Sequence, residues 1–85
     1  MITKKIAVGI QTGLEARPVA MLEQMASQYE SSIYIEDESR KVNAKSIMGM
    51  MSLALGTGES VKVIAEGADE EAAIEDIEKY LSGDK

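Results

Sequence analysis

Two segments of the chain combine residue types that could do chemistry. The first covers residues 12–18, where a Thr-Gly turn precedes a helix with Pro18 in its first turn. Free backbone N–H groups at the start of a helix attract anions, and the guanidinium of Arg17 would add a planar cationic fork beside them. The same residues also fit a plainer role, with Glu15 capping its own helix and Arg17 in solvent. The residues alone leave both interpretations open.

The second segment, residues 45–53, begins at a serine, which is a favoured helix cap. The helix expected after Ser46 is apolar nearly all the way round, so part of its apolar surface should remain exposed. Exposed methionine beside a phosphorylatable serine indicates a docking surface. The alternative is that a small domain buries most of this helix, leaving Ser46 as a cap only. Gly49 costs the helix about 1 kcal/mol relative to alanine, which indicates that close approach matters there.

The composition excludes several kinds of site. The chain of 85 residues has neither cysteine nor histidine, so a disulfide framework, a thiol nucleophile, a Cys-based zinc site and a phosphohistidine are all excluded. The net charge of −6 argues against direct nucleic-acid binding and favours a basic partner. No apolar run approaches membrane-spanning length, and the first ten residues lack a signal-peptide cleavage pattern. We therefore expect a cytoplasmic protein with no membrane contact and no cofactor or metal.

Alternating apolar residues predict four strands. These strands are expected over residues 5–11, 32–36, 40–43 and 60–66. A polar turn at residues 37–39 separates the second strand from the third, as is typical of a hairpin.

Three helices are expected between and after these strands. The middle one should span residues 47–53, and Asp69 is a strong N-cap for the last one. The stripes that would face a core are Leu22, Met25, Ala26 and Tyr29 on the first helix, and Ala73, Ile77, Tyr80 and Leu81 on the last. The order βαββαβα implies an α+β sandwich in one domain over residues 1–85, with one sheet and helices on a single face.

Two long motifs resemble a known family. TGLEARPVA (residues 12–20) and KVNAKSIMGMMSLALGTG (residues 41–58) are similar to the two signature regions of HPr, the small phosphocarrier of the bacterial sugar phosphotransferase system. The resemblance runs from about Ile6 to Leu81. It implies the HPr fold, an open-faced β-sandwich with a four-stranded antiparallel sheet and three helices on one face.

The first motif departs from the phosphocarrier pattern G-[IL]-H-A-R-P. In that pattern the histidine accepts phosphate from enzyme I, whereas this sequence has Glu15 there and retains Gly13, Ala16, Arg17 and Pro18. The resemblance therefore implies a former active-site position at Glu15 and Arg17, with no ordinary phosphocarrier activity. Arg17 is carried over as an anion-facing residue.

The second motif is intact. In Gram-positive relatives, HPr kinase/phosphorylase phosphorylates the serine with ATP, and the product is corepressor for a LacI-type catabolite control regulator. The catabolite repression HPr subgroup (Crh) lacks the histidine and keeps this serine, and the present chain is similar to it. The resemblance implies phosphorylation at Ser46 and a partner surface. That surface would comprise Arg17, Ala20, Met21, Gln24, Ser46, Ile47, Met48 and Met51.

Phosphate on Ser46 would add a charge of about −1.5 to −2 at a helix start, where backbone N–H groups favour it. Little rearrangement is then expected, and the main change is in the electrostatics of an apolar patch.

Two alternative functions and the oligomeric state stay open. The chain could be a phosphocarrier HPr of the phosphoenolpyruvate-dependent system with a natural or engineered change at position 15. It could also be an adaptor that binds partners through the Met-rich helix without phosphorylation. Its first strand, hinged at residues 11–13, could stay within a monomer or exchange between subunits in a swapped homodimer.

Overall fold

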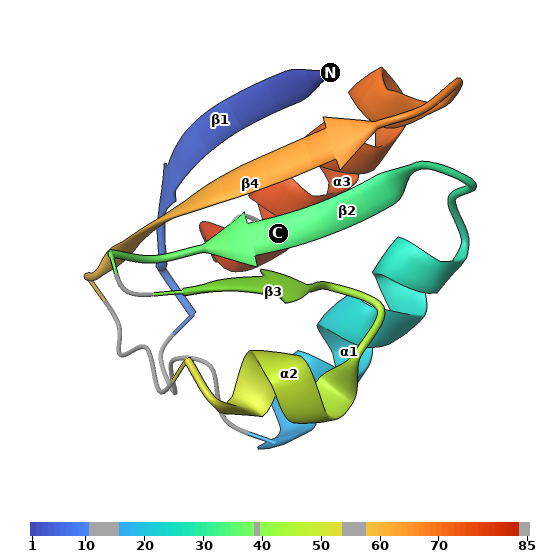
Figure 1. The fold of residues 1–85 in the computed structure, drawn as a ribbon. Coiled ribbons are helices and arrows are strands. Elements are labelled where there is room, and N and C mark those ends of the chain that lie inside the picture. Colours follow the sequence, from blue (N-terminus) through green and yellow to red (C-terminus); the bar gives the residue numbers. More distant parts are fainter. Residues whose placement is uncertain (11–15, 39, 54–57, 84–85) are drawn as a thin grey trace.

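The computed structural model describes residues 1–10, 16–38, 40–53 and 58–83. In chain order its elements are β1 (Ile2–Ala7), α1 (Ala16–Ser27), β2 (Ser32–Glu36), β3 (Lys41–Asn43), α2 (Ile47–Met51), β4 (Ser60–Glu66) and α3 (Glu70–Leu81). The strands form one antiparallel sheet in the order β1-β4-β2-β3 (Figure 1). The predicted α+β fold and its βαββαβα order are confirmed. No helix in the described ranges is long and apolar enough to cross a membrane.

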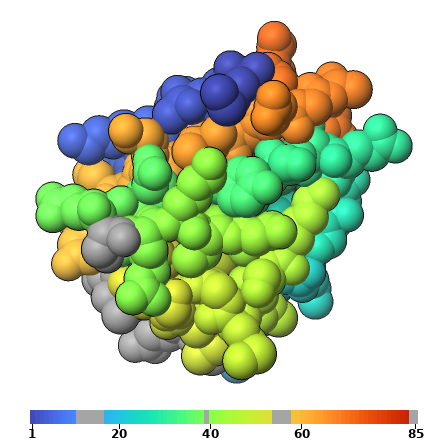
Figure 2. Space-filling model, in the orientation of Figure 1, coloured from blue at the N-terminus to red at the C-terminus, as the bar shows by residue number. Residues whose placement is uncertain are grey.

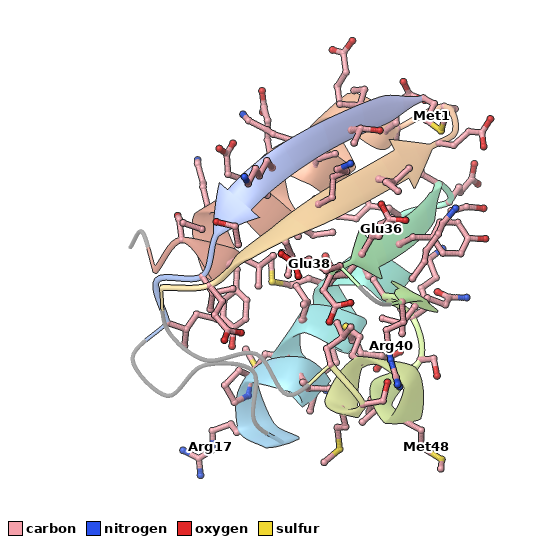
Figure 3. The ribbon with its side chains drawn as sticks, turned by 60° about the vertical axis from the view of Figure 1, so that its left-hand side comes forward. Met1, Arg17, Glu36, Glu38, Arg40 and Met48 are labelled. Carbon is pink, nitrogen blue, oxygen red and sulfur yellow. The ribbon has the colours of Figure 1, made fainter. Side chains whose placement is uncertain are left out.

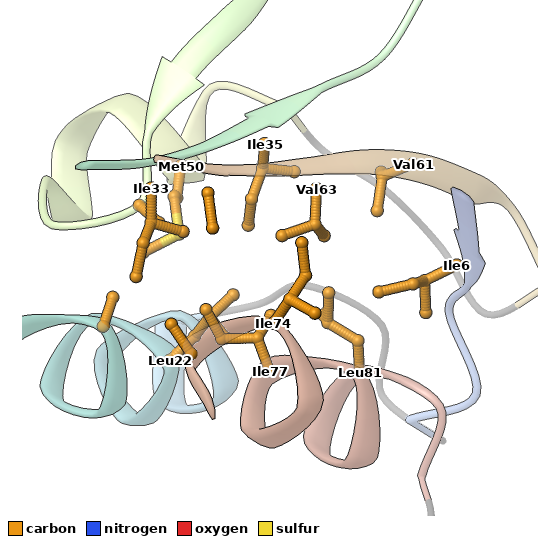
Figure 4. Packing of buried hydrophobic residues seen from close by; sticks show 14 of the residues in the cluster. Ile6, Leu22, Ile33, Ile35, Met50, Val61, Val63, Ile74, Ile77 and Leu81 are labelled. Atoms are coloured by element: carbon orange, nitrogen blue, oxygen red, sulfur yellow. The ribbon is translucent and has the colours of Figure 1, made fainter. Parts of the chain in front are cut away.

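The core lies between one face of the sheet and the helices α1 and α3 (Figure 4). Period-two alternation produces it, because every second side chain of a strand points to the same face. The central strand β4 buries Val61, Val63 and Ala65 and exposes the charged residues Lys62 and Glu66. Each fully buried aliphatic side chain contributes about 1.5–3 kcal/mol, so these alternating positions set the register of the sheet.

The short helix α2 occupies a different place, beside the edge strand β3. It packs against α1 and β3 and contributes Met50 to the core. Its other apolar side chains do not reach the core, and this leaves an apolar surface at the edge of the fold.

The first strand differs from its prediction over residues 5–11. It begins at Ile2, and Lys4 occupies one of its core-side positions. The Lys4 side chain reaches past the core, and its Nζ lies 2.7 Å from Oε1 of Glu78 on α3. A charged residue at an inward position hid the start of the alternation. Val8 is buried and continues the pairing by hydrogen bonds beyond Ala7, whereas Gln11 lies outside the described residues.

The third strand and the middle helix are shorter than predicted. Strand β3 begins one residue later than expected, because the Arg40 carbonyl closes the preceding turn by accepting from the backbone N–H of Asp37. Helix α2 ends at Met51, with Ser52 as its C-cap, and Leu53 is buried just after it.

The predicted helix stripes are confirmed in part. On α1, Leu22 and Ala26 are buried and Met25 is half-buried, but Tyr29 lies beyond the helix, which ends at Ser27. Tyr29 packs beside the core from the following loop, and its hydroxyl donates a 2.7 Å hydrogen bond to Asp76. The carboxylate raises the pKa of Tyr29 through this bond.

On α3 the stripe is wider than predicted. Ala73, Ile77 and Leu81 are buried, Tyr80 is half-buried, and Ile74 joins the core although the prediction omitted it.

Asp69 stands at the N-cap position of α3, but its side chain does not cap the helix. Its carboxylate accepts hydrogen bonds from the backbone N–H groups of Glu30 and Ser31 and from the Ser31 hydroxyl. The bond from the buried Ser31 hydroxyl is the largest cause of the lowered pKa of Asp69. Asp69 thus occupies the predicted position, but the prediction that its side chain caps the helix is wrong. The carboxylate instead joins the α1–β2 loop to the start of α3.

Glu70 makes a second connection at the same place. Its carboxylate accepts from the backbone N–H of Gly67 at 3.0 Å and lies 3.1 Å from the terminal amine of Met1. The Gly67 bond is the main cause of the lowered pKa of Glu70.

We expect these two carboxylates to make the fold sensitive to acid. Their pKa values in the folded state lie below the ordinary 3.8 and 4.5, so the unfolded chain binds more protons in that range. Their contribution to the free energy of unfolding is fully present above the ordinary pKa values of the unfolded chain. It is lost as the pH falls through the lower pKa values of the folded state. Asp69→Asn should lower the urea midpoint at pH 7 and flatten its decline on acidification, as measured by urea unfolding from pH 7 to pH 3.

Glu71→Gln, at an exposed position in the first turn of α3, is the matched control and should keep the wild-type decline. An Asp69→Asn variant with the wild-type pH dependence would contradict this account.

Candidate functional site

The turn between β3 and α2 positions Ser46. The Asn43 side-chain oxygen accepts from the backbone N–H of Lys45 at 2.8 Å, and the Asn43 carbonyl accepts from the backbone N–H of Ser46 at 3.0 Å. Asparagine forms such local turns readily because its side chain can replace a backbone acceptor. Asn43 therefore directs the chain from the sheet edge into α2, a role that the sequence analysis did not assign.

Ser46 caps α2, as predicted. Its backbone is extended, and its Oγ accepts from the backbone N–H of Gly49 at 3.2 Å. The side chain is half-buried and stands at the start of a helix of five residues. So short a helix sums few peptide dipoles, and the Gly49 N–H bond is the specific interaction that the structure gives to Oγ.

The predicted close approach at Gly49 is confirmed, and the approaching group is the cap itself. A Cβ added at Gly49 would lie 3.3 Å from Ser46 Oγ and 3.6 Å from Val42 Cβ. The absence of a side chain at Gly49 thus leaves room beside the serine hydroxyl.

Helix α2 turns most of its apolar surface outward. Met48 is 86% exposed, Met51 49% and Ile47 39%, whereas Met50 is fully buried. The prediction that part of this helix's apolar surface remains exposed is confirmed, and Met50 is the residue of the helix that is buried in the core. Three exposed apolar side chains on one short helix form a patch, and such patches mark interaction sites.

One face of α1 adds to this surface. Arg17, Met21 and Gln24 are exposed and Ala20 is half-buried, and their i, i+3, i+4, i+7 spacing places them on one side of the helix. The opposite side carries the buried Val19, which anchors the helix.

The two helices pack against each other, and Figure 3 shows Arg17 and Met48 protruding at the same end of the molecule. We call the eight residues that they present the α1/α2 surface. They are Arg17, Ala20, Met21, Gln24, Ser46, Ile47, Met48 and Met51. Arg17 is the one charged residue of this set, so the surface is apolar with a cationic margin.

A further contact at this place escaped the sequence analysis. Nζ of Lys45 donates a 2.7 Å hydrogen bond to the carbonyl of Tyr29, just after the end of α1. A lysine near the last carbonyls of a helix satisfies groups that lack an intrahelical partner. The contact joins residues far apart in the sequence, so no local pattern predicts it. It fixes the residue before Ser46 relative to α1.

The other predicted junction, residues 12–18, lies largely outside the described residues. Of it, the structure describes the side chains of Arg17, which is exposed, and Pro18, which is buried in the first turn of α1. Glu15, predicted as a helix cap or a former active-site position, falls outside that range. The α1/α2 surface is thus the part of the candidate site that the structure brings together.

Comparison with known proteins agrees with this arrangement. Residues 2–82 match the family model described as PTS HPr component phosphorylation site. The HPr-like protein Crh of Bacillus subtilis is 47% identical over 81 residues, which cover 95% of each chain. The crystal structure of the phosphocarrier protein HPr from Bacillus anthracis superposes with a TM-score of 0.91 at 44% identity, covering 94% of this chain and 95% of that one.

A crystal structure of Bacillus subtilis Crh has a TM-score of 0.81 at 45% identity, covering 100% of this chain and 98% of that one. It is described as a dimer with a swapped domain. The family match spans nearly the whole chain, and both a phosphocarrier HPr and a Crh protein share its fold. The chain therefore belongs to the HPr family and is similar in sequence to its Crh-type members.

Proposed function

We propose that this chain is a cytoplasmic regulatory protein of the Crh type, acting in carbon catabolite repression as one HPr-like domain over residues 1–85. HPr kinase/phosphorylase phosphorylates Ser46, and the product is corepressor for a LacI-type catabolite control regulator. The protein is a substrate of the kinase and not itself an enzyme. The observation that carries this proposal is the position of the Ser46 hydroxyl, half-buried at the margin of the exposed residues Ile47 and Met48.

Phosphorylation requires only an accessible Ser46 hydroxyl from this chain. Ser46 Oγ attacks the γ-phosphorus of ATP, an O–P bond forms, the bond to ADP breaks, and the hydroxyl proton goes to a base of the kinase. In the structure Oγ is an acceptor for the Gly49 N–H, so the hydroxyl proton is not needed for the cap. The space left by Gly49 gives the phosphoryl group access to Oγ.

The phosphate then changes the charge of a surface that already exists. It adds about −1.5 to −2 beside Ile47 and Met48, which together present a large apolar area. A partner that offers arginine or lysine to the phosphate and an apolar hollow to the methionines would recognise both features at once. Recognition therefore depends on the modification without requiring a new fold.

Replacement of Ser46 tests this proposal. Ser46→Ala should accept no phosphate from the kinase and ATP in mass spectrometry. Its affinity for the regulator, measured by titration calorimetry, should then lie at least about tenfold below that of the phosphorylated wild type. Loss of the cap should cost about 1 kcal/mol, so the variant should remain folded.

Ser52→Ala is the matched control, since Ser52 is an exposed serine at the opposite end of the same helix, where its hydroxyl donates to the Gly49 carbonyl. It should be phosphorylated and bind as the wild type does. Regulator binding that is equally tight before kinase treatment would contradict the phosphorylation switch and favour an unmodified adaptor.

A second candidate is the phosphocarrier function of the phosphoenolpyruvate-dependent sugar system. It is favoured by the likeness to the Bacillus anthracis phosphocarrier and by the retention of Arg17 and Pro18. The carboxylate at Glu15 opposes it, because an imidazole and a carboxylate are different nucleophiles.

Glu15→His measures how much of that function remains. If only the nucleophile has been lost, the variant should accept phosphate from phosphoenolpyruvate through enzyme I, followed with labelled phosphate. The regulatory proposal expects the wild type to accept none under the same conditions. Transfer to the unchanged chain would contradict that proposal and support the phosphocarrier.

The chain's own assembly is either a monomer or a strand-swapped homodimer. Strand β1 pairs with β4 from Ile2 to Ala7, and the same register could form between two chains that exchange β1. The swapped dimer described for Bacillus subtilis Crh supports the second form.

A further inference from the structure

The face of the sheet turned away from the helices carries a second pattern that regulation through Ser46 does not use. Figure 2 looks onto this side of the molecule, with α3 behind the strands in Figure 1. Two adjacent rows of side chains cross it, each row formed by residues that face one another in the register of neighbouring strands. The first row is Lys5, Lys62, Glu36 and Lys41, and the second is Thr3, Ile64, Tyr34 and Asn43.

The first row places like charges side by side. Lys5 lies directly opposite Lys62 in the antiparallel β1–β4 pair, and both are exposed. Such a pair destabilises a sheet, because the side chains of directly opposed residues are neighbours. Among the described residues no ion pair involves either lysine, whereas Lys4 on the other face is paired with Glu78.

Protection of a sheet edge does not account for this row. Lysine on an edge strand discourages pairing with other chains, and this suffices for Lys5 on β1 and Lys41 on β3. Lys62, however, lies on β4, which is paired on both sides. Lys62 has Lys5 on one side and Glu36 on the other, so the row sets three lysines against one carboxylate and the repulsion between Lys5 and Lys62 is only partly offset. A repulsion that is left partly offset in this way is characteristic of a functional surface.

The second row supplies an apolar centre. Ile64 lies opposite Tyr34, and both are half-buried although no described element covers this face. Nζ of Lys41 lies 4.7 Å from the centre of the Tyr34 ring, which holds this ammonium beside the apolar pair. On the far side of the pair Glu66 lies opposite Ser32, so the face is polarised along the strands.

From these rows we infer that the open face of the sheet binds an acidic segment of a partner protein. Carboxylates of the segment would lie on the opposed pair Lys5 and Lys62 and, beyond Glu36, on Lys41. One apolar side chain would lie on the Ile64–Tyr34 pair. The charge of the whole chain, −6, disfavours nucleic acid and anionic lipid, whose many phosphates it would repel. A local contact with a few carboxylates experiences mainly the nearby lysines, because salt screens the more distant charges.

A second copy of this chain is a less suitable occupant. Its acidic helix α3 would dock on the open face in a head-to-tail manner, which leaves one free face at each end and leads to open polymers unless the rotation closes. The open face lies across the sheet from the core on which α1 packs. The protein could thus hold the acidic segment and a partner on the α1/α2 surface at the same time.

The test is a titration of the ¹⁵N-labelled chain with a random copolymer of glutamate and tyrosine, followed by two-dimensional NMR. Amide shifts should change on all four strands, including β3 at Lys41, and the binding should weaken steeply with added salt. Lys5→Glu should weaken the binding at least about tenfold. It should leave the urea midpoint unchanged or higher, since a like-charge pair becomes an opposite-charge pair.

Lys79→Glu reverses an exposed lysine on α3 and serves as the matched control, with affinity within about twofold of the wild type. Lys5→Gln repeats the test without a new negative charge and should weaken binding in the same direction. Shift changes confined to the α1/α2 surface, or equal losses in Lys5→Glu and Lys79→Glu, would overturn the inference. Tighter binding of single-stranded DNA or of anionic vesicles at the same lysines would also overturn it.

Discussion

Strand β4 pairs with β1 on one side and β2 on the other, and its alternation of buried and exposed residues holds the rest of the fold in place. Val61, Val63 and Ala65 point into the core, so a shift of one residue would expose all of them and bury Lys62. The register of β4 therefore decides which face of the sheet the helices cover. It also decides what remains on the open face.

The α1/α2 surface depends on the register of β4 indirectly, through strands β2 and β3. Strand β3 pairs with β2 through Lys41–Asn43, and the Asn43 turn then starts α2 at the sheet edge. Met50 and the packing against α1 anchor the helix, and the bond from Lys45 to the Tyr29 carbonyl links the two helices. A five-residue helix would be marginal by itself, because nucleation is costly and few hydrogen bonds repay it. The exposed methionines are thus held in place by the contacts of α2 with α1 and β3 and not by the helix alone.

Much of this could be predicted from the sequence, for identifiable reasons. Every core-side position of β2 and β4 holds an apolar residue, so the bounds of these strands agree with the prediction. Ser46 is predictable as a cap because serine is a favoured residue before a helix and an apolar run follows it. The predictions failed where a side chain acts over a distance in the sequence. Lys4 reaches Glu78 from an inward position, and Asp69 binds Ser31 in place of its own helix.

The same limit applies to the two surfaces. Spacing places Arg17 and Met21 on one helix face, but their position beside α2 follows from packing that no local pattern contains. Prediction of the row of lysines on the open face requires the register of all four strands. No single segment of the sequence determines how the strands pair.

Phosphorylation of Ser46, as proposed, changes the charge of a surface that the fold already holds in place. Two-dimensional NMR of the ¹⁵N-labelled chain before and after treatment with the kinase and ATP tests it most directly. We expect amide shift changes confined to the β3–α2 turn, α2 and the adjoining part of α1, with β4 and α3 unchanged. Shift changes that spread through β4 and α3 would contradict it, because they would show that the modification remodels the core.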